Sequence, residues 1–359
     1  MALFHPLKVV DIRRETADCV SVAFQVPGEL ADTYKFTQGQ YLTFKKDING
    51  ESIRRSYSIC SSPMEGELRV AIKKVDGGRF STFANEELKV GDVLETMKPT
   101  GRFYTALSTE NKKHYVAFAA GSGITPMMSI MKTTLATEPN SHFTLFYGNR
   151  NFNSIIFREQ IEDLKDRYMN RLSVYHILSG DALGSDLLTG RLDGEKCERF
   201  CTHLFDYKNV DHYFLCGPGS MIHEVKDKLV DMGVEPTRIH FELFTTPGQS
   251  AQQSAEPKEK KAAGGGILCE VSIIMDGHTQ QMELDSLGMP ILDAALHKGL
   301  DVPYACKGAV CATCKAKVLE GEVEMEMNYS LEPDELAAGY VLTCQAHPKT
   351  KKVVVDYDH

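Results

Sequence analysis

Four cysteines near the C-terminal end of the sequence have a spacing suited to an iron–sulfur cluster. Cys306, Cys311 and Cys314 form a C-x4-C-x2-C pattern, and Cys344 follows later in the chain. This is the ligand pattern of plant-type 2Fe–2S proteins, in which four thiolates hold two irons. The alternatives are a chance grouping of thiols or a zinc site. Zinc ribbons usually have two C-x2-C pairs, and only one is present here.

A glycine-rich turn in the middle of the chain is suited to binding a phosphate. Gly121, Gly123, Thr125 and Pro126 follow an apolar run, HYVAFAA, and open a stretch with helical periodicity. Glycines permit a tight turn and a close approach of the backbone to a ligand. The helix start supplies free N–H groups, and proline is tolerated there. Placed between a strand and a helix, this G-x-G-x-x-P segment predicts a dinucleotide-binding turn; a plain strand–helix turn is the alternative.

The end of the next apolar run bears on which dinucleotide is bound. An acidic residue there would favour NADH, whereas an arginine can accommodate the 2′-phosphate of NADPH. The run ends YGNRN, with Arg150 at this position and no acidic residue beside it. The sequence therefore favours NADPH over NADH, unless Arg150 simply faces solvent.

A second Gly–Pro turn follows a later apolar run, DHYFLCGP. Cys216, Gly217 and Pro218 stand at its end, and Met221 lies just beyond in the next helical stretch. Ligands bind at the carboxyl ends of strands in parallel sheets. We expect a compact turn here, with the polarisable Cys216 sulfur beside a planar ring; an ordinary buried thiol is the alternative.

The first hundred residues contain two further candidate segments. In RSYS, Arg55 can pair with a pyrophosphate, Tyr57 can pack on a ring or sugar, and Ser58 can hydrogen-bond a ring nitrogen. GGRFST precedes a possible helix whose first N–H groups can hold phosphate oxygens. Its candidates are Gly78, Phe80, Ser81 and Thr82. Each segment alone is an ordinary strand or turn, and their joint order makes them informative.

The pattern of apolar runs predicts three domains. Residues 1–107 contain short β-like runs separated by Gly, Pro and Asn, which predicts a small antiparallel β-barrel. Residues 108–245 alternate apolar runs with helical stretches, which predicts an α/β domain with a parallel sheet. Residues 267–359 mix strands, a helix and the cysteine loop, which predicts an α+β domain resembling a β-grasp.

Composition adds a linker and a charge asymmetry. Residues 246–266, TPGQSAQQSAEPKEKKAAGGG, lack hydrophobic periodicity and predict a flexible linker that spans about 25 Å. From Ile267 onward there are seven lysines, no arginine and fifteen acidic residues, which is nearly all of the net charge of −9. This charge disfavours nucleic acid as a partner and suits either transient docking to a basic protein or plain solubility.

In this order the motifs identify a family. R-x-Y-S, G-x-x-S, G-x-G-x-x-P and C-G-P together resemble the ferredoxin–NADP reductase superfamily over residues 1–244, and residues 267–359 resemble a plant-type ferredoxin. The domain order resembles the reductase components of bacterial multicomponent oxygenases. YGNRNFNSIIFREQIEDLK and DLLTGRLDGEKCERF extend the likeness to the reductase subunits of phenylacetyl-CoA epoxidases.

The resemblance implies a role for each motif. Ser58, Cys216 and Phe244 are the expected catalytic residues, with Phe244 the doubtful candidate for the aromatic side chain that shields the flavin. Residues of the first domain would bind FAD, with FMN as the alternative: Arg55, Tyr57, Ser58, Lys73, Gly78, Phe80, Ser81 and Thr82. Residues of the second would bind NADPH or NADH: Gly121, Gly123, Thr125, Pro126, Arg150, Cys216, Gly217, Pro218 and Met221. Cys306, Cys311, Cys314 and Cys344 would bind the 2Fe–2S cluster.

The implied function is an electron relay from NAD(P)H through FAD and the cluster to an oxygenase component. A reductase of another oxygenase or of a fatty-acyl desaturase, a stand-alone reductase of small acceptors and a redox sensor are the alternatives. The sequence has no apolar run long enough to span a membrane and no apolar signal core at its N-terminus, and it contains ten cysteines. These features predict a cytoplasmic protein.

Overall fold

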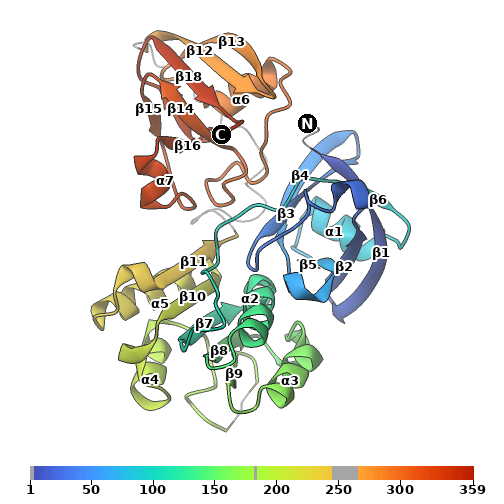
Figure 1. Ribbon diagram of the computed structural model, residues 1–359, viewed down its shortest axis with the longest axis vertical. Helices are drawn as coiled ribbons and strands as arrows, with labels where there is room; N and C mark the ends of the chain where they lie inside the picture. The colour runs from blue at the N-terminus through green and yellow to red at the C-terminus, as the bar shows by residue number, and fades with distance from the viewer. Residues whose placement is uncertain (1–3, 182–183, 245–265) are drawn as a thin grey trace. The chain divides into compact units, whose positions relative to one another are not determined.

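The structure is a computed structural model, and it describes residues 4–181, 184–244 and 266–359. It contains three sheets of five or six strands and one short two-stranded sheet (Figure 1). Apart from residues 54–56, the first two of these sheets, which form the N-terminal and middle domains, belong to one compact unit, and the C-terminal domain belongs to a second. The predicted linker, residues 246–266, lies outside the described residues except for Gly266.

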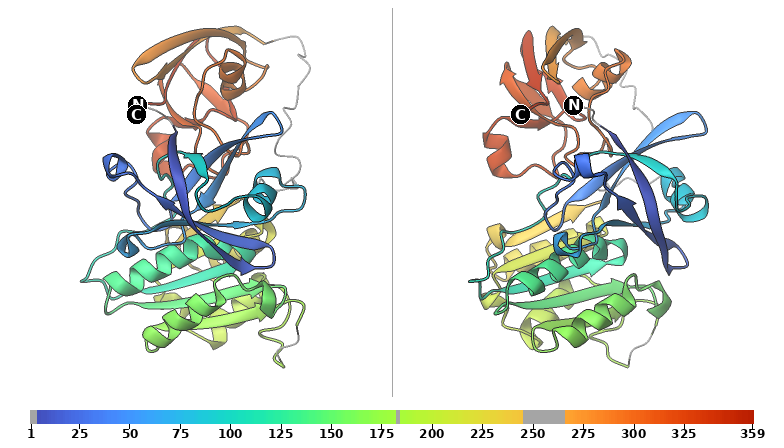
Figure 2. Two further views of the ribbon diagram at one scale, coloured as in Figure 1. Left: turned by 90° about the vertical axis from the view of Figure 1, so that its right-hand side faces the viewer. Right: turned by 45° about the vertical axis from the view of Figure 1, so that its right-hand side comes forward.

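The N-terminal domain is a strongly curved antiparallel sheet, as both views of Figure 2 show. Its strand order is β4-β3-β6-β1-β2-β5. A bridge from Ile59 to Val70, beside the hydrogen bond from Cys60 N to Arg69 O, brings the two edges together. The predicted barrel is therefore confirmed. The elements are β1 His5–Thr16, β2 Cys19–Gln25, β3 Tyr41–Ile48, β4 Glu51–Ser58, β5 Leu68–Lys73, α1 Arg79–Glu86 and β6 Val93–Thr96.

The middle domain has a five-stranded sheet in which every neighbouring pair is parallel. Helices α2 and α3 lie on one side of it and α4 and α5 on the other (Figure 1). Side chains such as Phe118, Phe146 and Phe214 are fully buried, as expected for a sheet covered on both faces. The elements are β7 His114–Ala120, α2 Ile124–Thr137, β8 His142–Asn149, α3 Arg158–Arg167, β9 Leu172–Leu178, α4 Gly194–His203, β10 His212–Gly217, α5 Gly219–Asp231 and β11 Ile239–Leu243.

The strand order of this sheet, β11-β10-β7-β8-β9, locates its ligand-binding edge. The chain runs outward from β7 to β9 and then returns to β10 on the other side of β7. The order therefore reverses between β7 and β10, and open α/β sheets bind ligands at such a reversal, beside the carboxyl ends of the strands. Both Gly turns predicted from the sequence follow these two strands.

Hydrogen bonds connect the N-terminal domain to helix α2 of the middle domain. Ser129 Oγ donates to the carbonyl of Ser61 at 2.7 Å, and the hydroxyls of Ser62 and Thr133 lie 2.9 Å apart. Lys132 forms an ion pair with Glu65 at 3.1 Å. The two serine contacts are buried, so water does not compete with them, and they fix helix α2 against the barrel.

The C-terminal domain is a mixed sheet of order β13-β12-β18-β14-β16, with α6 packed against it. Cys269, Val271, Leu292 and Val353 contribute to a core of its own. This arrangement confirms the predicted α+β fold. Its elements are β12 Leu268–Met275, β13 His278–Asp285, α6 Ile291–His297, β14 Lys315–Glu320, β15 Val323–Met325, α7 Pro333–Ala337, β16 Tyr340–Leu342, β17 Ala346–Pro348 and β18 Lys352–Asp356.

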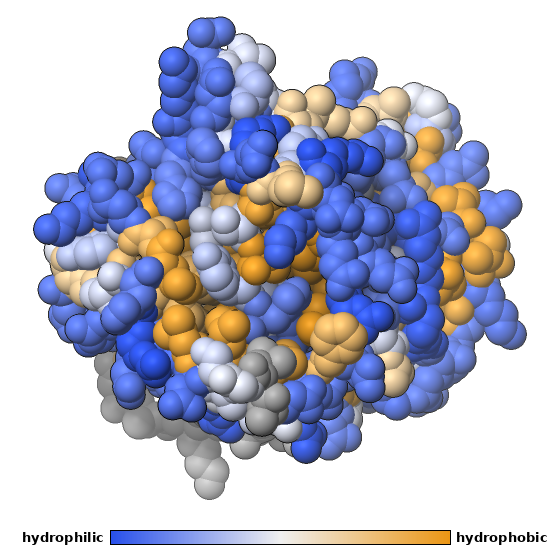
Figure 3. Space-filling model, turned by 90° about the horizontal axis from the view of Figure 1, so that it is seen from below, coloured by the Kyte–Doolittle hydropathy of each residue, from blue (hydrophilic) through white to orange (hydrophobic). Residues whose placement is uncertain are grey.

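The surface of the middle domain is mixed in polarity. Seen from below in Figure 3, apolar side chains form patches between hydrophilic ones. Among the described residues, no helix has both the length and the apolar character needed to cross a membrane.

Candidate redox-cofactor sites

The cluster cysteines gather in one loop region of the C-terminal domain. Cys306, Cys311 and Cys314 lie between α6 and β14, and Cys344 lies between β16 and β17. Cys314 and Cys344 are buried, whereas Cys306 and Cys311 are partly exposed. The thiols that the sequence separates by thirty residues are therefore brought together by the pairing of β14 with β16.

The four thiols form two hydrogen-bonded pairs. The Cys306 thiol donates to Cys311, which lowers the pKa of Cys311 to about 6. The Cys314 thiol likewise donates to Cys344 and lowers the pKa of Cys344. No group of three or more His, Cys, Asp or Glu side chains in the described ranges surrounds a single ion position. Two pairs of thiols fit two irons, with one pair for each iron.

The backbone of the loop turns N–H groups toward the sulfurs. Gly308 N donates to Cys306 Sγ at 3.3 Å, and Cys306 N lies 3.5 Å from Cys311 Sγ. Lys307, Ala309 and Ala312 have φ angles of +55°, +64° and +49°, a left-handed conformation that non-glycine residues seldom adopt. Such strain is common at ligand sites. The loop therefore fits a cluster whose sulfurs accept hydrogen bonds.

The predicted dinucleotide turn lies at the reversal of the middle sheet. Gly121 has a φ of +54°, and a side chain there would point into open space, so the glycine leaves room for a ligand. At Gly123 a Cβ atom would lie 2.0 Å from the carbonyl oxygen of Cys216. The turn after β7 can therefore touch the end of β10 only because Gly123 has no side chain. Thr125 Oγ1 donates to the carbonyl of Ser122 at 2.6 Å, and Pro126 occupies the first turn of α2.

The turn after β10 packs equally closely. A Cβ atom at Gly217 would lie 2.9 Å from Met221 Cε and 3.1 Å from Ala120 Cβ. Pro218 precedes the first residue of α5, and Met221 is buried in its first turn. No side chain caps the start of α5, so its first N–H groups are available to a ligand. At the start of α2, Ile124 N already donates to the carbonyls of Gly121 and Ser122. The two predicted turns therefore lie against each other and form one edge of backbone.

Two of the three expected catalytic residues, Ser58 and Cys216, lie at this edge, and each is next to Glu242. Ser58 Oγ, from β4 of the barrel, donates to Glu242 Oε2 at 3.3 Å. Glu242 is the register partner of Cys216 in the pairing of β10 with β11. Burial, together with the charge of Glu242, raises the pKa of the Cys216 thiol, so Cys216 is a neutral thiol at physiological pH. A hydroxyl, a carboxylate and a buried neutral thiol therefore lie together where the two domains meet.

Sequence reasoning missed Glu242. It lies two residues before Phe244 in IHFELF, and alternation along β11 was the available signal. Tyr147 was also missed: its hydroxyl donates to the carbonyl of Gly121 at 3.1 Å and so supports the dinucleotide turn.

The predicted flavin residues divide between the surface and the interior of the barrel. Tyr57 is partly exposed, and its ring centroid lies 5.6 Å from that of Phe80. Phe80 is only 1% exposed, so its ring belongs to the core, and only its backbone is placed to meet a phosphate. Arg55 lies two residues before Tyr57 on β4. Lys73 ends β5 and forms an ion pair with Asp18 at 3.5 Å.

Helix α1 begins in a way that suits a pyrophosphate. Gly78 precedes its first residue and supplies no capping side chain, so N–H groups of the first turn are available. A Cβ atom on Gly78 would lie 2.5 Å from Ser81 Oγ, which accepts a hydrogen bond from Val75 N and donates one to Gly78 O. Thr82 N donates to Gly78 O at 3.0 Å. Gly78 thus keeps this turn tight, and its role in binding FAD stays a prediction.

Two predicted residues lie at the margins of the site. Arg150 follows β8 with an exposed side chain, and its carbonyl accepts a hydrogen bond from Gly180 N at 2.6 Å. Phe244 is 39% exposed and is the last residue described before residue 266. Its role as a flavin shield stays a prediction.

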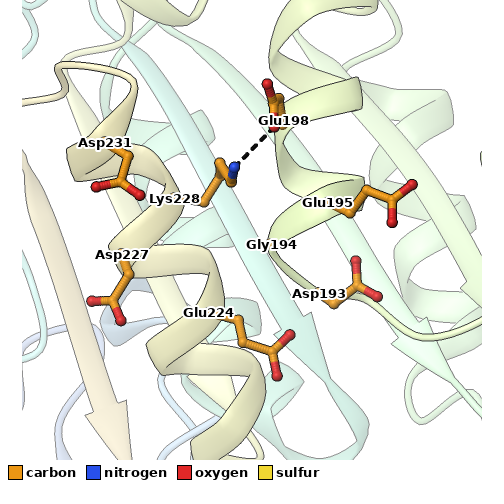
Figure 4. Close-up of a pocket in the computed structure, with 8 residues that line it drawn as sticks. All are labelled: Asp193, Gly194, Glu195, Glu198, Glu224, Asp227, Lys228 and Asp231. Atoms are coloured by element: carbon orange, nitrogen blue, oxygen red, sulfur yellow. Dashed lines mark hydrogen bonds and ion pairs between the residues drawn. The ribbon is translucent and has the colours of Figure 1, made fainter.

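An open hollow of the middle domain lies away from these sites. It occupies about 500 Å³ and is lined by residues at and within helices α4 and α5, none of which belongs to the predicted sites. Figure 4 shows its acidic side chains and the ion pair between Lys228 and Glu198 at 2.9 Å. The strand ends and the cysteine loop, where the cofactor sites are expected, do not line this hollow.

Three family models match the chain in the expected order. Residues 6–104 match an oxidoreductase FAD-binding domain, residues 118–227 an oxidoreductase NAD-binding domain, and residues 273–349 a 2Fe-2S iron-sulfur cluster binding domain. The chain therefore has domains for FAD, for NAD(P)H and for a 2Fe–2S cluster. The models give the kind of each domain, and the boundaries at residues 107, 245 and 266 remain our proposal.

Relatives of known activity match over the whole chain. One component of the 1,2-phenylacetyl-CoA epoxidase of Escherichia coli (strain K12) is 48% identical over 358 residues, which cover 100% of this chain and 99% of that protein. The ferredoxin reductase component of the 3-ketosteroid-9-alpha-monooxygenase of Rhodococcus rhodochrous is 33% identical and covers 98% of this chain and 96% of its own length.

Solved structures support the fold. Phthalate dioxygenase reductase, described as a modular structure for electron transfer from pyridine nucleotides to [2Fe-2S], superposes with a TM-score of 0.57 at 22% identity and covers 98% of both chains. An intact type IV self-sufficient cytochrome P450 monooxygenase gives a TM-score of 0.68 at 19% identity, covering 98% of this chain and 41% of that one. With these domains, this order and these full-length relatives, the chain belongs to the family of ferredoxin–NADP reductase-like flavoproteins that carry a 2Fe–2S ferredoxin domain.

Proposed function

We propose that this chain is the reductase subunit of a phenylacetyl-CoA epoxidase, and that it passes electrons from NADPH to the oxygenase component. The observation that carries this proposal is the 48% identity to the Escherichia coli epoxidase component over 99% of that protein's length. When bound, FAD accepts two electrons as a hydride, and the 2Fe–2S cluster carries them onward one at a time. The residues of the chain supply binding, orientation and electrostatics.

The edge at the ends of β7 and β10 would hold the nicotinamide against the flavin. Gly121 leaves room for the dinucleotide, and Gly123 brings the two strand ends together. The hydrogen bond from Ser58 to Glu242 joins the barrel to the middle sheet at this edge. Fixing two reactants in this way makes hydride transfer effectively unimolecular.

The preference for NADPH is part of the proposal. Arg150 lies exposed at the end of β8, where a 2′-phosphate would sit, and the nearby Asp181 carboxylate is occupied as an acceptor from Phe152 N at 3.0 Å. Replacing Arg150 by Ala should raise the KM for NADPH about tenfold and leave that for NADH unchanged, because only NADPH has the extra phosphate. An equal change in the KM for NADPH and in the KM for NADH would contradict this assignment.

A second candidate partner is the oxygenase component of another system. The full-length likeness to a reductase component of a 3-ketosteroid-9-alpha-monooxygenase, at 33% identity, favours it over a stand-alone reductase. The decisive experiment combines the pure protein with purified oxygenase components of either kind. The proposal predicts NADPH-dependent epoxidation of phenylacetyl-CoA, and turnover only with another oxygenase would refute it.

A pair of cysteine variants tests the order of electron transfer independently of the choice of oxygenase. Cys311→Ser removes one predicted ligand of the cluster, whereas Cys269→Ser changes a buried thiol of the same domain outside the cluster loop. Cys311→Ser should abolish electron delivery to the oxygenase while dye reduction at the flavin continues. Loss of dye reduction in folded, FAD-loaded Cys311→Ser protein would contradict the proposed order.

We also propose a cytoplasmic location. All ten cysteines lie in the described part of the chain, and none of them forms a disulfide there. Free thiols are typical of a reducing compartment. Cell fractionation tests this proposal, and recovery with a membrane or an extracellular fraction would refute it.

A further inference from the structure

Gln345, the residue after the last cluster cysteine, is buried inside the cluster loop. Its side chain belongs to a residue only 6% exposed, in the short segment between β16 and β17. Its amide nitrogen donates to the carbonyl of Lys307 at 3.2 Å and lies 3.7 Å from Cys344 Sγ. Because a carbonyl can only accept, the contact with Lys307 fixes which end of the amide faces the sulfur.

The contact with Lys307 extends the influence of Gln345 to the other pair of cysteines. Lys307 follows Cys306 and has a φ of +55°, a conformation that needs support from its surroundings. The next residue, Gly308, donates its N–H to Cys306 Sγ at 3.3 Å. One buried amide therefore touches a sulfur of the Cys314–Cys344 pair and also holds the backbone that bonds to the Cys306–Cys311 pair.

The hydroxyls of Thr343 and Tyr357, on the same side of the loop, have contacts of a different kind. Thr343 Oγ1 donates to the carbonyl of Cys314 at 2.9 Å and accepts from Tyr357 OH at 2.7 Å. This chain of hydroxyls ends on a backbone oxygen and brings no donor to a ligand sulfur. Gln345 differs from these two hydroxyls because its side chain offers an N–H to the sulfur of Cys344 itself.

We propose that Gln345 is a positioning residue that raises the reduction potential of the 2Fe–2S cluster. Reduction adds one electron, which comes from the bound flavin, and no proton or bond is transferred at Gln345. The added charge spreads onto the ligand sulfurs, so an N–H dipole aimed at Cys344 Sγ stabilises the reduced form more than the oxidised form. This inference deepens the proposed function, because it concerns the step that precedes delivery to the oxygenase.

The test replaces the amide and keeps the shape. Gln345→Met keeps an unbranched side chain of similar length and removes both N–H groups. Gln281→Met is the control, because Gln281 lies exposed on β13 of the same domain. The midpoint potential of the cluster is measured in the full-length holoprotein by a redox titration followed by electron paramagnetic resonance. Gln345→Met should decrease the ratio of reduced to oxidised cluster at a fixed potential about tenfold, which is about 59 mV for one electron.

A second variant keeps the test decisive if Gln345→Met does not fold. Gln345→Asn retains an amide, but the side chain is one methylene shorter and moves the N–H groups away from Cys344 Sγ. It should decrease the potential in the same direction. A wild-type potential in either folded variant, with iron and sulfide fully present, overturns the inference. No oxygenase takes part in this measurement, so a wrong choice of partner under the proposed function does not affect its outcome.

Discussion

Gly123 provides the sharpest test of the proposed dinucleotide edge. A Cβ atom there would lie 2.0 Å from the carbonyl oxygen of Cys216, 2.4 Å from its carbonyl carbon and 2.8 Å from Gly217 N. These are backbone atoms at the end of β10, where Cys216 is buried and Gly217 partly exposed, so they cannot rotate away as a flexible side chain can. The φ of Gly123 is −61°, which alanine adopts without strain. Any effect of Gly123→Ala must therefore come from this collision.

The size of the effect follows from the displacement that the collision demands. An ordinary carbon–oxygen contact is about 3.3 Å, so the turn after β7 has to move by more than about 1 Å from the end of β10. Overpacking of this kind costs about 1–3 kcal/mol of stability. A displacement of about 1 Å at a reacting site can reduce activity about 100-fold. In the Gly123→Ala variant we expect kcat/KM for NADPH-driven dye reduction to fall about 100-fold, while FAD and the cluster stay bound.

The control is Gly28→Ala in the N-terminal domain. A Cβ atom at Gly28 would meet nothing within 4 Å, and its φ lies outside the left-handed range. This variant should match the wild type in thermal midpoint and in kcat/KM, or be slightly more stable because alanine has fewer conformations in the unfolded chain. If Gly123→Ala behaves like Gly28→Ala, the two strand ends do not form the site as described.

Two further predictions concern titratable groups. Glu242→Gln should lower the rate of hydride transfer about tenfold with little change in the KM for NADPH. The variant weakens the contact with Ser58 where the two domains meet and leaves the turns after β7 and β10 intact. An unchanged rate in single-turnover experiments would contradict this role. Burial, with the nearby charge of Lys113, lowers the pKa of His212 to about 4. Since the unfolded chain binds this proton near pH 6.5, the free energy of unfolding should be constant above that pH and should fall as the pH drops from 6.5 toward 4. His212→Gln should reduce this dependence in urea titrations, by about 1 kcal/mol at most after allowance for the partial exposure of the ring; an unaltered pH profile would contradict it.

Short sequence patterns predicted the elements whose form depends on neighbouring residues of the chain. The apolar runs HYVAFAA and DHYFLCGP of the middle domain become β7 and β10, with bounds that differ by a residue or less, because buried parallel strands are continuously hydrophobic. The cysteine spacing likewise identified the cluster loop, since ligand geometry restricts it. In the C-terminal domain the strands β14 to β18 were not predicted, because their pairing depends on contacts far apart in the sequence.

The parts of the site that sequence reasoning missed are long-range contacts. Glu242 matters because β11 pairs with β10 and faces Ser58 of another domain. Gln345 matters because its amide reaches Lys307 across the cluster loop. The need for glycine at position 123 was predicted as a general feature of the motif, but the atoms that require it, at the end of β10, are visible only in the fold. Phe80 shows the converse, since a residue of a predicted phosphate motif places its ring in the core.

The order of electron transfer within the chain is tested most directly by mixing the oxidised holoprotein with NADPH under anaerobic conditions in a stopped-flow spectrometer. We predict that flavin absorbance bleaches first and that the absorption of the iron–sulfur cluster decreases afterwards, in protein containing one FAD and two irons per chain. Cluster reduction that precedes flavin bleaching, or that persists in protein stripped of FAD, would contradict the relay.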